Sequence, residues 1–236
     1  MRCLILLAVP VVAGNCVTTQ SAIPLVDIKS VDPTIVIELR YAGANNLAGR
    51  ALYAPGTPAL VRPEVALRLV AAQAFLRRYN YGLKIWDAYR PKSVQIQLWQ
   101  AAHKNHDYVA DPQAGAGSLH SWGLAVDATL IDPWHRPVLM PTDYDNFTPA
   151  AMWYYRGGDP AICSHLRLLQ IAMRDAGFYG QPREWWHFVT ADWQKYLPRE
   201  EAERAMQALE PGDRAPIMTN PTQIDKTLDF NLTRQR

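Results

Sequence analysis

The feature that most constrains this chain is a pair of short motifs that lie far apart in the sequence. Residues 118–127 read Ser-Leu-His-Ser-Trp-Gly-Leu-Ala-Val-Asp, and residues 184–187 read Glu-Trp-Trp-His. Together they supply two imidazoles, one carboxylate ligand and one spare carboxylate. A catalytic zinc needs such a set, because it takes three protein ligands, keeps a fourth position open for water and works beside a general base. The fold must therefore bring the two motifs together.

The spacing of the first motif sets a condition on its local structure. His120 and Asp127 are seven residues apart, and an odd separation places two side chains on opposite faces of a regular strand. Both can bind one ion only if His120 lies in a turn before the strand, and Gly123 permits such a bend. Glu184 and His187 pose the same problem, which a β-bulge or a strand end would solve.

The composition indicates one folded domain. The 236 residues are 49% hydrophobic and 19% charged, with a formal net charge of +2, and these values are typical of globular chains. The length suffices for one domain with a full core. No basic run with interleaved aromatic residues occurs in the sequence, so we expect no nucleic-acid partner. The sequence does not specify an oligomeric state.

The first 22 residues have a different character. Arg2 precedes an apolar run at residues 4–12, and the small residues Ala13 and Gly14 follow it, which is the pattern of a secretory signal. Cys16 stands where a bacterial lipoprotein carries its acylated cysteine, although the residue before it fits that pattern poorly. The alternative is a buried N-terminal strand or helix. We expect export to the periplasm or cell envelope, with membrane contact only through a lipid anchor at Cys16.

Periodicity predicts mixed strands and helices without regular βαβ alternation, which indicates an α+β fold with a central antiparallel sheet flanked by helices. Strands are expected within residues 23–40, 83–89, 124–131 and 183–190, and helices at residues 63–79, 91–104 (favoured over a strand), from 164 to Gly177, and 199–209. Ser164 is expected to cap the third helix. The expected buried stripes are Val65, Leu69, Ala72 and Leu76 in the first helix and Leu166, Leu169 and Met173 in the third. The expected organisation is a signal at 1–22, a catalytic domain at 23–198, and a C-terminal helix with an irregular tail at 199–236.

Taken together, the two motifs resemble those of the zinc D,D-peptidases, which share a fold with the Hedgehog signalling domain. The closest resemblance is to the VanX-type D-alanyl-D-alanine dipeptidases. It runs from about residue 25 to residue 197 and includes Trp-Asp-Ala-Tyr-Arg-Pro at 86–91 and Tyr144-Asp145. It implies one zinc ion per chain, bound by His120, Asp127 and His187.

The same resemblance implies roles for the residues around the metal. Glu184 matches the general base, and Arg90 matches the arginine that steadies the developing oxyanion. Asp145 matches the acid that holds the free ammonium of a small D,D-dipeptide substrate. Three further substrate-binding candidates are Tyr41, Ser118 and Tyr53.

Other interpretations remain open at this point. The same fold serves D,D-carboxypeptidases and endopeptidases that act on peptidoglycan stem peptides, and a zinc-bearing module could lack catalysis. Arg90 could serve only in an ion pair with Asp87, and Asp145 lies in a loop with other acidic residues. A base aimed at the metal site favours an enzyme over a binding module.

Overall fold

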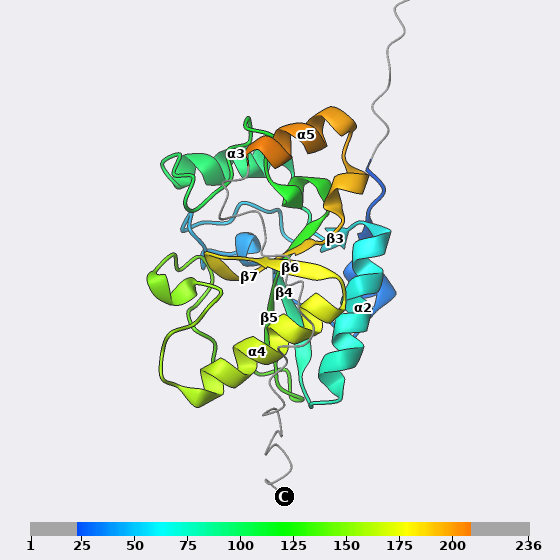
Figure 1. Cartoon of the computed structure of the whole chain (residues 1–236), viewed down its shortest axis with the longest axis vertical. Helices are drawn as coiled ribbons and strands as arrows, with labels where there is room; N and C mark the ends of the chain where they lie inside the picture. Colours follow the sequence, from blue (N-terminus) through cyan, green and yellow to red (C-terminus); the bar gives the residue numbers. More distant parts are fainter. Residues whose placement is uncertain (1–22, 209–236) are drawn as a thin grey trace, which may run out of the picture.

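The computed structural model describes residues 23–208, so the expected signal at 1–22 and the tail from 209 onward lie outside the described residues. A five-stranded sheet in the order β2-β4-β5-β7-β6 runs through the molecule (Figure 1). Its strands are β2 (Val36–Ile37), β4 (Gly82–Asp87), β5 (Ala125–Ile131), β7 (Glu184–Thr190) and β6 (Phe178–Gln181). Between residues 23 and 208, no helix has the length and apolar character needed to cross a membrane.

The sheet is mostly antiparallel, as the sequence predicts. The pairs β4–β5, β5–β7 and β6–β7 are antiparallel, whereas β2 pairs with β4 in parallel. The parallel pair is a correction to the prediction, and its cause is the connection: α2 (Pro63–Arg77) lies between β2 and β4 in the chain, and a crossover of that kind returns the strand in the same direction. A second, two-stranded sheet pairs β1 (Val26–Asp27) with β3 (Leu60–Val61).

Helices cover the sheet on both sides. In Figure 1, α3 (Lys92–Ala101) and α5 (Arg199–Ala208) lie above the strands β6 and β7, α4 (Pro160–Asp175) lies below them, and α2 runs down the right side. The predicted stripe of α2 is confirmed, because Val65, Leu69, Ala72 and Leu76 are all fully buried, and the predicted stripe of α4 is buried as well. Every residue of β4 and β5 is also buried, so the central strands form the core that supports the site.

The start of α4 differs from the prediction. Asp159 is the N-cap, and its carboxylate accepts hydrogen bonds from the backbone N–H groups of Ala161 and Ile162. Ser164 lies inside the helix, where its hydroxyl donates to the carbonyl of Pro160 at 2.8 Å. An aspartate directly before a proline is the stronger start signal, because proline fits the first helical turn and the carboxylate satisfies free N–H groups.

The N-terminal segment also differs from the prediction. Residues 23–40 form no continuous strand but contain β1, the one-turn helix α1 (Ile28–Val31) and β2. Asp27 caps α1 by accepting from the backbone N–H of Lys29 at 3.0 Å. Short single turns η1 (Arg40–Ala42), η2 (Leu119–Trp122), η3 (Pro149–Ala151) and η4 (Trp193–Tyr196) complete the described elements.

Candidate active site

The first motif folds into a turn followed by a strand. His120 lies in η2, and Gly123 ends that turn with φ of +67°, so that β5 begins at Ala125. A Cβ at position 123 would stand 2.6 Å from Leu25 Cδ2 and 3.2 Å from the backbone nitrogen of Arg62. Glycine is therefore required both by the left-handed backbone and by the close approach. His120 lies before the strand, as the spacing of the motif required.

The second motif lies beside the first because β7 pairs with β5. His187 is the direct cross-strand partner of Asp127, and directly opposed residues share a face of the sheet. The pairing of β6 with β7 shifts at this point, since Gly180 pairs with Phe188 but Gln181 pairs with Glu184. Glu184 is also the first residue of β7, so the strand end, one of the two predicted solutions, is the one that the structure shows.

A bulge lies on the other side of Asp127. Ile85 pairs with Ala128 while Asp87 pairs with Asp127, so Trp86 is an extra residue in β4. Bulges bend a strand and redirect its side chains. Asp87, Asp127 and His187 consequently lie across three neighbouring strands in the middle of the sheet.

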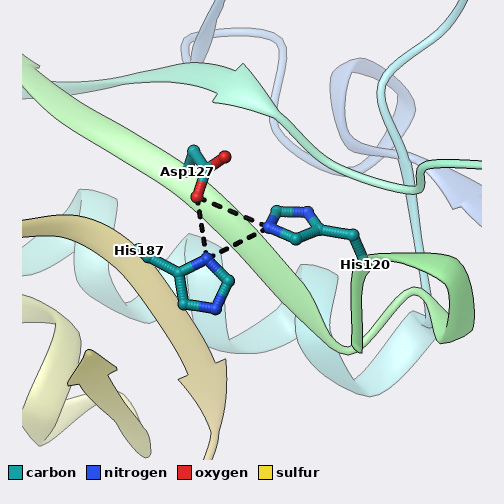
Figure 2. A group of neighbouring side chains, drawn as sticks. All are labelled: His120, Asp127 and His187. Atoms are coloured by element: carbon teal, nitrogen blue, oxygen red, sulfur yellow. Dashed lines mark hydrogen bonds and ion pairs between the residues drawn. The ribbon is translucent and has the colours of Figure 1, made fainter. Parts of the chain in front are cut away.

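The three predicted ligands point at one another (Figure 2). His187 Nδ1 lies 3.0 Å from Asp127 Oδ1, His120 Nε2 lies 3.2 Å from His187 Nδ1, and His120 Nε2 lies 3.4 Å from Asp127 Oδ1. Zinc bonds of about 2.0–2.1 Å in tetrahedral directions separate ligand atoms by about 3.3–3.4 Å. The donor triangle therefore fits a zinc ion, with two imidazole nitrogens and one carboxylate oxygen as the donors.

Groups behind the ligands fix their orientation. His120 Nδ1 donates to the carbonyl of Ala88 at 2.8 Å, so the proton lies on Nδ1 and the lone pair of Nε2 faces the other two ligands. Asp87 Oδ2 lies 3.5 Å from the same Nδ1. Burial alone would raise the pKa of Asp127, but the charges and hydrogen bonds of His120 and His187 outweigh it and hold that pKa well below the usual range. Asp127 is thus ionised, as a metal ligand must be.

Glu184 stands next to the donor triangle without being part of it. Its Oε2 lies 3.8 Å from His187 Nδ1, and the side chain retains 21% of its exposure. Burial raises its pKa to about 7, His187 opposes the rise, and the charges of Asp127 and Asp145 add to it. A carboxyl group with such a pKa can both accept and return a proton near neutral pH.

Arg90 follows β4 and is buried beside the predicted metal ligands. Its guanidinium binds Asp87 Oδ2 through Nε at 2.8 Å and Gln95 Oε1 through Nη1 at 2.8 Å. Nη2 lies 3.7 Å from Asp127 Oδ2, and the guanidinium carbon stands 4.9 Å from the ring centroid of Tyr41. The ion pair of Arg90 with Asp87 is thus present, and it holds the positively charged guanidinium at the edge of the cluster of predicted ligands.

Asp145 lies in the loop after β5 and faces the segment that follows η1. It has φ of +54°; its Oδ2 accepts from the backbone N–H of Leu47 at 2.8 Å and its Oδ1 from the hydroxyl of Tyr41 at 3.4 Å. Burial raises its pKa to about 7, and the hydrogen bond from Leu47 opposes that rise. Tyr41 links Asp145 to the predicted ligand cluster, because its hydroxyl contacts Asp145 and its ring lies against the Arg90 guanidinium.

The remaining two predicted substrate-binding residues, Ser118 and Tyr53, have different surroundings. Ser118 is buried and precedes η2, with no hydrogen bond from its side chain to the turn. The hydroxyl of Tyr53 donates to Asp87 Oδ1. Tyr53 thus supports the carboxylate that binds Arg90, and its contact with a substrate stays a prediction.

Comparison with known proteins decides the family. The sequence matches the family described as D-ala-D-ala dipeptidase over residues 21–205. The chain belongs to this family.

Curated D-alanyl-D-alanine dipeptidases are similar to this chain over about two thirds of its length. A D-alanyl-D-alanine dipeptidase of Escherichia coli is 35% identical over 164 residues, which are 70% of this chain and 83% of the relative. One of Enterococcus faecalis is 26% identical over 173 residues, or 66% of this chain and 85% of the relative. Among solved structures, the vancomycin resistance D,D-pentapeptidase VanY with Zn(II) covers 61% of this chain and 80% of its own, at 15% identity and a TM-score of 0.40.

Two further residues of this dipeptidase-family site escaped the sequence-based assignment of roles. Tyr144 donates its hydroxyl to Asp127 Oδ2 at 2.7 Å, and Gln95 accepts from Arg90 and donates to the carbonyl of Ala110. The ion pair of Asp87 with Arg90, by contrast, is one of the sequence-based interpretations and is present. For Tyr144 the available signal is its place directly before Asp145, and that place does not reveal which side chain its hydroxyl contacts.

Proposed function

We propose that this chain is a zinc-dependent dipeptidase that hydrolyses D-alanyl-D-alanine. The observation that carries the proposal is the donor triangle of His120, Asp127 and His187, with ligand atoms 3.0–3.4 Å apart and Glu184 beside it. A structural zinc site is usually closed by a fourth protein ligand, whereas three ligands and a free carboxylate are the arrangement of a hydrolase. The membership of the chain in the D-ala-D-ala dipeptidase family supports the same substrate class.

The roles of the side chains follow from their positions. Zinc, when bound there, supplies a Lewis acid that makes water a competent nucleophile near neutral pH. Glu184 takes a proton from the attacking water and returns it to the leaving amine, a role worth roughly 10²–10⁴ in rate. Arg90 holds a fixed positive charge where negative charge develops on the scissile carbonyl oxygen, and Asp87 and Gln95 keep the guanidinium from moving.

Asp145 completes the site as the acceptor for the substrate ammonium. Its two oxygens already accept from Leu47 and Tyr41, so the carboxylate is fixed before a substrate arrives. An ammonium placed against it gains a charge-assisted hydrogen bond in a site with little water. Tyr41, Tyr53 and Ser118 are assigned to the walls that hold the remaining atoms of the dipeptide.

We propose further that the enzyme is exported and works in the cell envelope, either free in the periplasm or anchored through a lipid at Cys16. The support is the signal-like pattern of residues 1–22. An exported dipeptidase does not meet the cytoplasmic pool of newly made dipeptide, so its role is salvage or turnover of wall-derived fragments. Fractionation with mass spectrometry of the mature N-terminus tests this, and uncleaved protein in the cytoplasm would refute it.

One assay tests the reaction. The purified, zinc-loaded full chain is offered free D-Ala-D-Ala and, in parallel, an N-acylated peptide that ends in D-Ala-D-Ala. Cleavage of the dipeptide with little cleavage of the acylated peptide is expected. Equal cleavage of both would assign the enzyme to stem peptides as a D,D-carboxypeptidase or endopeptidase. Zinc binding without any cleavage would make it a non-catalytic module.

A further inference from the structure

The two carboxylate oxygens of Asp127 face different neighbours. Oδ1 faces the other two predicted ligands, at 3.0 Å from His187 Nδ1 and 3.4 Å from His120 Nε2. Oδ2 points away from them and accepts the hydroxyl of Tyr144 at 2.7 Å, with Arg90 Nη2 at 3.7 Å. The two oxygens of Asp127 therefore have different tasks. Oδ1 belongs to the triangle of predicted metal-ligand atoms, and Oδ2 faces the hydroxyl of Tyr144 and the guanidinium of Arg90.

The ring of Tyr144 cannot easily leave this position. It is only 4% exposed, and three buried aromatic rings surround it: Trp86 at 5.4 Å, Tyr41 at 5.6 Å and Trp186 at 5.6 Å between centroids. Tilted and edge-on packing of this kind stabilises a defined ring orientation. The hydroxyl is consequently directed at Asp127 by the packing of its own ring.

The backbone at Tyr144 is held as well. The Tyr144 N–H donates to Asp143 Oδ1 at 2.8 Å. Arg40 and Asn45 in turn donate to the same carboxylate, at 3.4 Å and 3.3 Å. The segment that carries Tyr144 is thus tied to the chain around η1, independently of any contact with the metal ligands.

We propose that Tyr144 is a positioning residue that makes Asp127 bind the metal through Oδ1 alone. A carboxylate can bind a metal through one oxygen or through both, and a hydrogen bond from Tyr144 occupies the lone pair that Oδ2 would need for the second bond. With one oxygen engaged, the metal keeps a position open for water and substrate. This inference rests on the proposed zinc site and deepens it.

The same segment links the metal to substrate recognition. Tyr144 is directly followed by Asp145, whose carboxylate is the proposed ammonium acceptor, and both face inward from one short stretch. The contact to one predicted ligand and the ammonium acceptor are therefore linked through two consecutive residues. A dipeptide must span the distance between the metal and that acceptor, so Tyr144 also contributes to the register of the substrate.

The test compares Tyr144→Phe with wild type in the full chain. The zinc affinity, measured by competition with a chromogenic chelator, is expected to fall about 10–100-fold, which is typical of lost support behind a metal ligand. The visible spectrum of the cobalt-substituted protein is expected to weaken, because binding through both oxygens raises the coordination number. The rate of zinc loss to EDTA is measured on protein purified with zinc, so a variant that unfolds only without metal still gives a result.

Tyr41→Phe is the matched control. Tyr41 is buried in the same aromatic cluster, but its hydroxyl faces Asp145 rather than Asp127, so zinc affinity and the cobalt spectrum should stay at wild-type values. Wild-type affinity and spectrum in Tyr144→Phe would overturn the inference, and so would equal weakening in both variants. If wild type itself bound neither zinc nor cobalt, the proposed function would fail, and this inference would fail with it.

Discussion

At the scale of single residues, the site places carboxylates that are close together in different electrostatic states. Asp127 stays ionised because two imidazoles offset its burial, while burial raises the pKa of Glu184 and of Asp145 to about 7 each. Like charges in one site cannot all ionise freely. Separate pKa values of this kind fit the proposed roles, in which Asp127 is a metal ligand and Glu184 exchanges protons.

The first prediction separates the base from the ligands. Glu184→Gln should retain zinc and the fold but lose at least about 10² in kcat, because the proton acceptor is removed while the donor triangle remains. Metal analysis and kinetics check it. His187→Ala is the contrasting variant: with no spare ligand in reach it should lose both zinc and activity. Loss of zinc in Glu184→Gln would make Glu184 a ligand and overturn its role.

The second prediction concerns how the ionisation of buried Asp145 lowers the free energy of unfolding. In the unfolded chain an aspartate has a pKa of about 3.9, whereas Asp145 in the folded protein has its pKa raised to about 7 by burial. The folded state therefore holds the proton more tightly, and stability is lost as the pH rises from about 4 to about 7. Asp145→Asn does not titrate, and asparagine tolerates the positive φ of this position.

The free energy of unfolding of zinc-free Asp145→Asn should thus exceed that of wild type by about 1–3 kcal/mol at pH 8. The gap should close toward pH 4. Urea unfolding at several pH values in the presence of a chelator measures both. A gap that stayed constant across this pH range would show that Asp145 ionises in the folded protein as it does in the unfolded chain.

At the scale of elements, turns and bulges rather than regular strands bring the site together. The turn η2 ends at Gly123 and places His120. A bulge at Trp86 lies beside Asp127 in the neighbouring strand, and the pairing of β6 with β7 shifts register where β7 begins at Glu184. In a regular strand, side chains alternate between the two faces of the sheet. Irregular backbone can bring side chains together that this alternation would keep apart.

The third prediction tests the turn. Gly123→Ala should lower the free energy of unfolding by about 1–3 kcal/mol, because alanine is strained at a positive φ and its Cβ would crowd Leu25 and Arg62. Zinc affinity should fall with it, because the turn carries His120. Gly56→Ala is the control, because Gly56 has φ of +75° with nothing within 4 Å of a new Cβ. This variant should lose only the free energy of unfolding that the strained backbone costs, and it should keep full zinc affinity. Unchanged zinc affinity in Gly123→Ala would contradict the role of the turn.

The same elements show what the sequence could predict. The buried stripes of α2 and α4 follow from helical periodicity, and the turn before β5 follows from the odd spacing of His120 and Asp127. The strands β3 and β6 escaped prediction, because runs of two to four residues carry too little periodicity and owe their pairing to neighbouring strands. The bond from Tyr144 to Asp127 depends on the path of an irregular loop, which no local pattern specifies.

At the scale of the whole molecule, the sheet carries most of the proposed reaction centre, and the loops carry the proposed acceptor for the substrate ammonium. Asp87, Asp127 and His187 lie on the three central strands, whose residues are almost entirely buried. Asp145 and Leu47 come from irregular segments that meet only in the folded chain. Such a division fixes the chemistry while leaving substrate choice to segments that can vary.

The last prediction concerns that substrate choice and depends on Asp145. In a dipeptide the ammonium lies one residue from the scissile carbonyl, within reach of a carboxylate beside the metal site. An acylated amine would bring an uncharged, bulkier group against Asp145 and leave its buried charge without a cationic partner, a loss that typically costs about 2–5 kcal/mol. Wild type should therefore prefer free D-Ala-D-Ala over the acylated peptide by about 10²-fold or more in kcat/KM. Asp145→Ala should damage dipeptide turnover more than cleavage of the acylated peptide, so that the preference narrows. Steady-state kinetics on both substrates with both proteins measure the effect, and a preference that Asp145→Ala left intact would assign the discrimination to other walls of the site.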